Sequence, residues 1–258
     1  MWVILFGGAM EWLRAADAKA EARSKVERDL HMIFIGMDDT DTLQSRGTGH
    51  LARAAAAELA EKYPVVGVTR HQLLEDARVP CTARNSCAAI LLDLDHADLD
   101  ALFAKVKAIM LADFQEGSDP GLCVAGSVPD AVIAFGRMVQ KELVTQDTAR
   151  TLATHFGLRL VGLGGDEDGV IGALAAVGLA ACGEDGRYVQ VGRIRSLQGM
   201  RSVEEILAAG AASVETLSGD QVSSGRVLTD KLRPARRGHR PIVVVEPLGD
   251  AWRPLKLN

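Results

Sequence analysis

The sequence predicts an α/β or α+β fold built from layers of helices on a sheet. Two observations lead to this class. Short apolar runs typical of buried strands alternate with alanine-rich or amphipathic stretches typical of helices. The chain also has 258 residues, of which 48% are hydrophobic, and this suffices for one large domain or two smaller ones.

The first part of the body begins with the apolar run "MIFIG", which predicts a short buried strand. The alanine-rich stretch behind it predicts a helix. Asp119, Pro120 and Gly121 form a strong turn signal, and Gly157 is a suitable helix stop. In order, we expect a strand at 32–36, a helix at 50–63, strands at 65–74 and 87–94, a helix at 97–111, a turn into a strand at 118–126, and a helix at 144–157.

The second part continues the alternation with shorter elements. We expect a strand at 158–163, a glycine-rich loop at 164–169, a helix at 170–182, a strand at 188–194, a helix at 202–210, and strands at 213–217 and 241–247. This order is compatible with a small ferredoxin-like domain over residues 156–258.

Composition excludes several classes of protein. The net charge of −5 argues against a protein that coats nucleic acid through general basicity, and 4% aromatic residues argues against an interface of stacked bases. The four cysteines form no CxxC pair, so neither a zinc ribbon nor a disulfide framework is indicated. Reduced thiols are typical of a cytoplasmic protein, and this is the compartment we expect.

Residues 1–31 read as an N-terminal extension. Their apolar stretch is short and has no positively charged segment before it, so it predicts neither a signal peptide nor a membrane span, and we expect no membrane partner. A strand pattern starts abruptly at Met32, which suggests that the extension is dispensable. The alternative is a helix that docks on the body.

Three carboxylates follow the first strand, in the motif "MDDTDT". Clustered aspartates at the end of a strand are hard oxygen ligands suited to Mg²⁺, which usually arrives with substrate phosphates. We therefore predict that Asp38, Asp39 and Asp41 hold Mg²⁺. The alternative is a solvated turn in which one aspartate caps the next element. A haloacid-dehalogenase-type motif fails, because Leu43 stands at its last position.

The segment "SRGTGH" comes directly before the alanine-rich helix. Free backbone N–H groups at a helix start attract anions, and glycine allows close approach of a phosphate. Arg46, Gly47 and Thr48 are therefore candidates for phosphate binding. The alternative is that Thr48 is only the N-cap of the helix.

A third motif, "GLGGDEDGVIGALAAVG", fits no generic nucleotide fingerprint. Gly164 and Gly169 have Walker A spacing, but Val170 and Ile171 stand where lysine and serine or threonine are needed. A dinucleotide fingerprint fails at Glu167. The pattern alone predicts a tight turn that enters a closely packed helix.

Together these segments resemble a known family, the archaeal agmatinylcytidine synthetase that modifies an isoleucine tRNA, TiaS. "MDDTDT" and "GTGHLA" are similar to its I-D-D-T-D-S and C-T-T-Y-L-A segments at the same separation. "VPCTARNSCAA" resembles P-x-K-T-R-G-N-G-A, "SDPGLCVA" resembles an N/D-P-G-V-V turn, and "DGVIGALAAVG" resembles R-G-L-I-G-A-L-A-A-I-G. The resemblance covers roughly residues 32–180 in the same order.

The resemblance implies a kinase-like α/β domain over 32–155, a ferredoxin-like domain over 156–258, and an ATP site between them. It implies that the acidic motif holds Mg²⁺ and phosphates, that Thr48 is an autophosphorylation site, and that Arg84 is catalytic. In the family, ATP activates a cytidine carbonyl by phosphorylation and the amine of agmatine displaces the phosphate. The nucleotide-binding residues that it implies are Gly36, Arg46, Gly47, Gly169, Val170, Ile171 and Gly172.

The sequence also departs from the family. Thr82 and Ala83 replace the lysine and threonine of K-T-R-G-N-G, and Asp168 stands where the family tends to carry a basic residue. We expect a compact form without the OB-fold and zinc-ribbon domains. The prediction is an ATP-dependent, Mg²⁺-requiring enzyme whose acceptor is a tRNA or a small molecule. A catalytically weak nucleotide-binding regulatory module is the alternative, and a phosphatase is least favoured.

The segment "DKLRPARRGHRP", residues 230–241, concentrates positive charge in an otherwise acidic chain. A solvated loop is one interpretation. The other is a loop in which Arg236 and Arg237 contact phosphates of ATP or of a nucleic acid.

Overall fold

The computed structural model describes residues 32–79, 81–82, 84–94 and 97–257, so the predicted extension over 1–31 lies outside the described residues. The helices are α2 (Thr48–Leu59), α3 (Leu99–Ala112), α4 (Asp130–Val139), α5 (Gln146–His155), α6 (Gly169–Cys182) and α7 (Val203–Ala208). The strands are β1 (Met32–Asp38), β2 (Val65–Gln72), β3 (Ser86–Asp93), β4 (Gly121–Ala125), β5 (Arg159–Gly162), β6 (Arg187–Val191), β7 (Met200–Ser202), β8 (Ser213–Thr216), β9 (Arg226–Leu228), β10 (Ala235–Arg237), β11 (Arg240–Leu248) and β12 (Ala251–Pro254). These elements confirm the α/β class.

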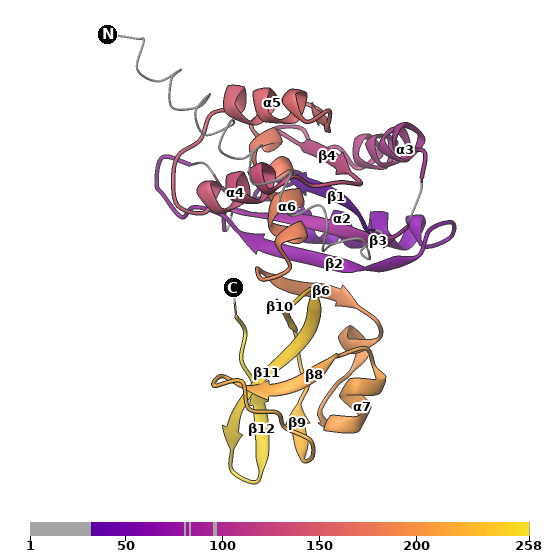
Figure 1. Cartoon of the computed structure of the whole chain (residues 1–258), viewed down its shortest axis with the longest axis vertical. Helices are drawn as coiled ribbons and strands as arrows, with labels where there is room; N and C mark the ends of the chain where they lie inside the picture. Colours follow the sequence, from indigo (N-terminus) through magenta and orange to yellow (C-terminus); the bar gives the residue numbers. More distant parts are fainter. Residues whose placement is uncertain (1–31, 80, 83, 95–96, 258) are drawn as a thin grey trace.

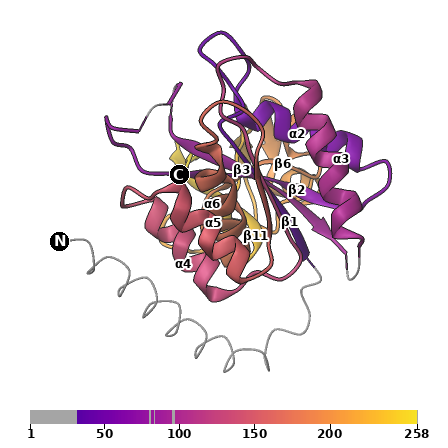
Figure 2. The same cartoon turned by 90° about the horizontal axis from the view of Figure 1, so that it is seen from above.

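The upper body in Figure 1 is a sheet with helices on both faces. Strands β4, β1, β3 and β2 lie side by side in that order, and every neighbouring pair is antiparallel. Residues alternate along β1, so Ile33, Ile35 and Met37 pack against α2 and α3, while Phe34 joins the core under α4, α5 and α6. Figure 2 shows the two helical layers on opposite sides of the strands.

The structure differs from the sequence prediction in where the ferredoxin-like order lies. The order β-α-β-β-α-β runs from β1 to β4, residues 32–125, rather than after residue 156. The boundary expected at residue 156 falls inside the same body, because β5 pairs with β4 and α6 packs across β1, β3, β4 and α4. Helix α6 packs in this way because its sequence is apolar on all sides. Such a helix must be covered by other elements all round, whereas an amphipathic helix needs cover on one face only. A division into separately folding units stays a prediction.

The small residues of α6 let it lie unusually close to the sheet. A Cβ on Gly36 of β1 would lie 2.1 Å from the backbone oxygen of Ala173, and a Cβ on Gly121 of β4 would lie 2.0 Å from that of Gly169. Glycine at both positions is therefore a packing requirement.

The lower unit in Figure 1 consists of β6 to β12 with α7, and it continues the sheet through β6, which pairs with β2 and β10. The basic segment 230–241 lies in this unit. We expected Arg236 to lie in a loop, either solvated or in contact with phosphates, and both interpretations are wrong for this residue. This residue is in strand β10 and only 3% exposed. Its guanidinium donates to the backbone oxygen of Ala180 at 2.8 Å and to the Tyr188 hydroxyl at 2.5 Å, so it ties the two units together.

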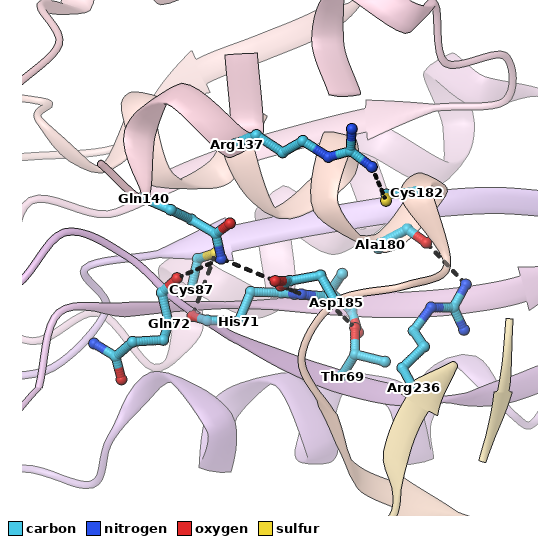
Figure 3. A network of polar contacts seen from close by, with 11 residues as sticks. Thr69, His71, Gln72, Cys87, Arg137, Gln140, Ala180, Cys182, Asp185 and Arg236 are labelled. Carbon is cyan, nitrogen blue, oxygen red and sulfur yellow. Dashed lines mark hydrogen bonds and ion pairs between the residues drawn. The ribbon is translucent and has the colours of Figure 1, made fainter. Parts of the chain in front are cut away.

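A second polar network connects the upper body to the turn that leads into the lower unit, as shown in Figure 3. The His71 side chain on β2 is fully buried, and its Nδ1 lies 2.7 Å from Oδ1 of Asp185, in the turn between α6 and β6. Its Nε2 lies 2.9 Å from Oγ1 of Thr69. Gln140 at the end of α4 donates to the other Asp185 oxygen at 3.0 Å. Both oxygens of the partly exposed Asp185 carboxylate therefore have partners in the upper body.

Most expected elements lie within a few residues of their predicted positions, but helix α4 and the short strands β7, β9, β10 and β12 were not predicted. The start of α4 after Pro129 carries no side-chain cap, so the N-terminal signal of this helix is weak. None of the described helices has the length and apolar character that a membrane span requires.

Candidate functional site

A cavity of about 570 Å³ opens at the end of β1, in the upper body. Its wall comes from the acidic loop after β1, the start of α2, the segment before β3, the loop between α4 and α5, and the start of α6. A cavity of this size takes a nucleotide-sized ligand.

The acidic loop is fixed by Asp41. Its Oδ1 accepts hydrogen bonds from the backbone nitrogen of Thr48 at 3.1 Å and from the Thr48 hydroxyl at 3.0 Å. Its Oδ2 accepts from the Thr82 hydroxyl at 2.7 Å. Helix α2 starts at Thr48 and its N-cap is Gly47, which supplies no side-chain hydrogen bond. Asp41 therefore caps the helix from a distance, and Thr48 is not its N-cap.

Burial and neighbouring carboxylates raise the pKa values of Asp38 and Asp39. Burial, then the charges of Asp39 and Asp41, raises the pKa of Asp38 to about 7. Burial, then the charges of Asp119, Asp41 and Asp168, raises the pKa of Asp39 to about 6. Asp39 also has a positive φ of 49°, an uncommon conformation for a residue other than glycine. Both aspartates line the cavity, where a cation would relieve their repulsion.

The residues fit Mg²⁺ bound together with phosphates better than Mg²⁺ bound by protein alone. Among the described residues, no three His, Cys, Asp or Glu side chains are arranged to hold a metal ion by themselves. Both Asp41 oxygens accept protein hydrogen bonds, which leaves Asp38 and Asp39 as the principal candidates. Mg²⁺ commonly takes one or two carboxylates and completes its shell with phosphates and water.

Two helices begin at the cavity. Thr48, the first residue of α2, and Gly169, the first residue of α6, both line it. The N–H groups of Thr48, Gly169, Val170 and Ile171 already donate to oxygens of the chain. The helix dipoles still place partial positive charge at both starts, and this charge favours an anionic ligand. Gly172 in the first turn of α6 faces Asp38 so closely that a Cβ would lie 1.7 Å from the carboxylate oxygen.

The sequence-predicted site residues divide into three groups in the structure. Those that line the first cavity are Asp38, Asp39, Asp41, Thr48, Arg84, Gly169, Ile171 and Gly172. Gly47 lines a second cavity beside it, and Arg46 is exposed with its guanidinium 3.0 Å from His50 Nε2. Gly36 and Val170 line neither cavity: Gly36 lies against α6, and Val170 is fully buried in the core.

Sequence reasoning missed several residues that the fold brings to this cavity. Asp119 precedes β4 and accepts a hydrogen bond from the backbone nitrogen of Asp166 at 2.7 Å. Asp168 precedes α6, and its Oδ1 accepts from Gln146 at 2.6 Å. The turn signal "SDPG" marked the Asp119 segment, but no local pattern indicated that it faces Asp39.

No protein-family model matches the sequence, and no curated protein matches it. Two solved structures share its fold with TM-scores of 0.50: a tRNA fluorescent labeling enzyme at 23% identity, and TiaS in complex with an isoleucine tRNA and ATP at 22% identity. Each alignment covers 57% of this chain and 36% of the other chain, so this chain matches little more than a third of either protein. The predicted resemblance to TiaS is confirmed as a similarity of fold.

Proposed function

We propose that the chain is an ATP-dependent, Mg²⁺-requiring enzyme with a TiaS-like role, which activates an acceptor by phosphoryl transfer. One observation carries the proposal: the repelling pair Asp38 and Asp39 shares a cavity with the starts of α2 and α6. The carboxylates suit a divalent cation, and the helix starts suit phosphates. The likeness of fold to a TiaS–ATP complex supports ATP as the phosphate-bearing ligand.

Phosphoryl transfer requires mainly positioning and neutralisation of charge. In this proposal, Mg²⁺ on Asp38 and Asp39 neutralises the phosphates. The partial positive charge at the starts of the two helices attracts the phosphates, and Arg84 contacts them from the segment before β3. The phosphoryl transfer would thus occur within the upper body, in a cavity to which α6 contributes part of the wall.

Thr48 is the candidate phosphorylation site. Its hydroxyl donates to Asp41 Oδ1 at 3.0 Å, which is the geometry of a nucleophile and a base. A proton lost from the hydroxyl would pass to Asp41, and the helix dipole of α2 would favour the added negative charge.

The acceptor of this TiaS-like enzyme is a tRNA or a small molecule, and the enzyme acts in the cytoplasm. The alternative, a nucleotide-binding regulatory module with weak catalysis, is favoured by two features. Asp168 adds negative charge at the start of α6, and Thr48 is only 6% exposed. Both features would slow phosphoryl transfer.

ATP turnover with and without Mg²⁺ tests the proposal. We expect parent protein to release ADP or AMP continuously with Mg²⁺, and Asp38→Asn and Asp39→Asn to abolish turnover while melting near the parent temperature. Asp250→Asn, at an exposed position outside the cavity, is the matched control and retains turnover. Unchanged turnover in both active-site variants would contradict the proposal, and ATP binding without turnover in the parent would favour the regulatory module.

A further inference from the structure

A second cavity, of about 690 Å³, lies on the other side of Thr48 and Arg84. It shares Asp41, Thr48, Thr82, Arg84 and Ser86 with the first cavity, so the two meet along a common wall. The rest of its described lining comes from the start of α2, from β2, β3 and β6, and from the segment after β12.

The second cavity is strongly basic in an otherwise acidic chain. Four cationic side chains line it: Arg70, Arg84, Arg187 and Lys256. Among its described lining residues the only carboxylate is Asp41, whose two oxygens accept hydrogen bonds from Thr48 and Thr82. Arg84 has an ion pair with Glu75 at 3.2 Å, and both side chains are more than half exposed, so this pair neutralises little of the charge.

The cations repel one another. Arg187 is only 6% exposed, and its guanidinium donates to the backbone oxygen of Leu257 at 3.2 Å. Burial followed by the charges of Arg70, Arg233 and Arg84 lowers its pKa to about 10. The charge of Arg187, followed by burial, lowers the pKa of Lys256. The charges of Arg70 and Arg84 also lower the pKa of Lys256, and a bound anion would relieve the repulsion among these three side chains.

We propose that the second cavity binds the carboxylate or phosphate group of a small acidic acceptor and holds that acceptor beside Thr48. The proposal rests on the function proposed above and names the class of its acceptor. Arginine presents a planar fork of donors that matches either oxyanion, and three of the four cations are arginines. A polyamine would be repelled by the same cluster.

Size and composition favour a small molecule over a nucleic acid. The volume is that of a cavity for one small ligand. None of its described lining residues is Phe, Tyr or Trp, so the ring of His50 is the one aromatic surface that its described lining offers to a base.

Calorimetric titration of the full chain without ATP tests the proposal, with inorganic phosphate and succinate as separate probes. We expect at least one of them to bind, and the stronger probe identifies the oxyanion. Arg70→Gln and Lys256→Gln would each weaken that binding by about tenfold or more, because each removes a charged partner of the anion. Arg253→Gln is the matched control, since Arg253 pairs with Glu246 on the lower unit at 2.5 Å and lines neither cavity.

Lys256 is exposed, so Lys256→Gln keeps the test valid if Arg70→Gln loses its fold. Failure of both probes to bind would overturn the proposal, as would parent-like affinity in Lys256→Gln. Binding of a single-stranded oligonucleotide with a steep salt dependence, in the absence of binding by either small anion, would assign the cavity to nucleic acid instead. None of these readouts requires ATP turnover, so this proposal and the proposed function fail separately.

Discussion

Gly172→Ala would test whether the start of α6 and Asp38 act as one site. The added methyl would lie 1.7 Å from Oδ2 of Asp38, 2.4 Å from its Cγ and 2.8 Å from its Cβ. The whole carboxylate end of the side chain would have to move, and Asp38 is held at the last position of β1. The substitution therefore displaces a proposed Mg²⁺ ligand without altering its chemistry.

Two opposing effects set the change in stability. Overpacking a tight contact typically costs about 1–3 kcal/mol. Replacing a helical glycine by alanine returns about 0.4–1 kcal/mol. The net loss is about 1–2 kcal/mol, which for a domain of this size lowers the melting temperature by roughly 2–8 °C. Loss of a charge-assisted contact, about 1.5–3 kcal/mol, would weaken Mg²⁺-dependent ATP binding by about 10- to 150-fold.

Calorimetric binding of ATP in the presence of Mg²⁺, together with thermal melts, measures both effects. The control is Gly126→Ala, where the added Cβ would meet only ordinary contacts, the nearest at 3.6 Å to Leu99. We expect this control to bind ATP as the parent does. If Gly172→Ala binds ATP with parent affinity while keeping its fold, then Asp38 does not ligate the Mg²⁺ of the nucleotide, and the assignment of this carboxylate is wrong.

Three further predictions concern residues around the two cavities and the connection between the units. Burial, only partly offset by Asp185, lowers the pKa of His71 below its usual 6.5, so the unfolded chain takes up a proton more readily. Melting temperature is therefore expected to fall as the pH drops below about 6.5, and His71→Asn is expected to flatten this dependence in melts from pH 8 to pH 5. Mass spectrometry of ATP-treated protein is expected to find phosphate on Thr48, and none at this position in the control Thr48→Val. Phosphate only at other sites would contradict the assignment of Thr48. Arg236→Met is expected to lower the free energy of unfolding in urea by about 1.5–3 kcal/mol, because it removes the buried hydrogen bonds that Arg236 donates to Ala180 and Tyr188. An unchanged urea midpoint would show that these hydrogen bonds do not stabilise the fold.

The sequence by itself determined the local features of this protein. The apolar run at 32–36 and the alanine-rich stretch behind it lie in β1 and α2, because hydrophobic periodicity is a property of neighbouring residues. The acidic motif, Thr48 and the start of α6 also line one cavity, as their resemblance to a nucleotide-handling family implied. Each motif keeps its local geometry because its residues are neighbours in the chain, whereas the meeting of the acidic motif with α6 was implied by the family resemblance and not by a local pattern.

Only the tertiary structure decided what lies opposite these motifs. Asp119 and Asp168 come close enough to perturb Asp39 because β4 pairs with β1 and α6 crosses both strands. The same close crossing makes Gly36 a packing residue, although the family resemblance implied a role in binding nucleotide. Strand pairing and helix packing of this kind depend on residues far apart in the chain, which no local pattern encodes.

The second cavity shows most clearly that the sequence alone does not reveal which residues come together. Arg70, Arg187 and Lys256 stand in segments that carry no common motif, and they converge because β2 pairs with β6 and the end of the chain lies near both strands. Conversely, the densest run of basic residues, 230–241, supplies none of the described lining of either cavity, and its Arg236 is buried instead. Charge along a sequence does not determine charge at a site, because the field at a cavity sums over side chains that folding alone brings together.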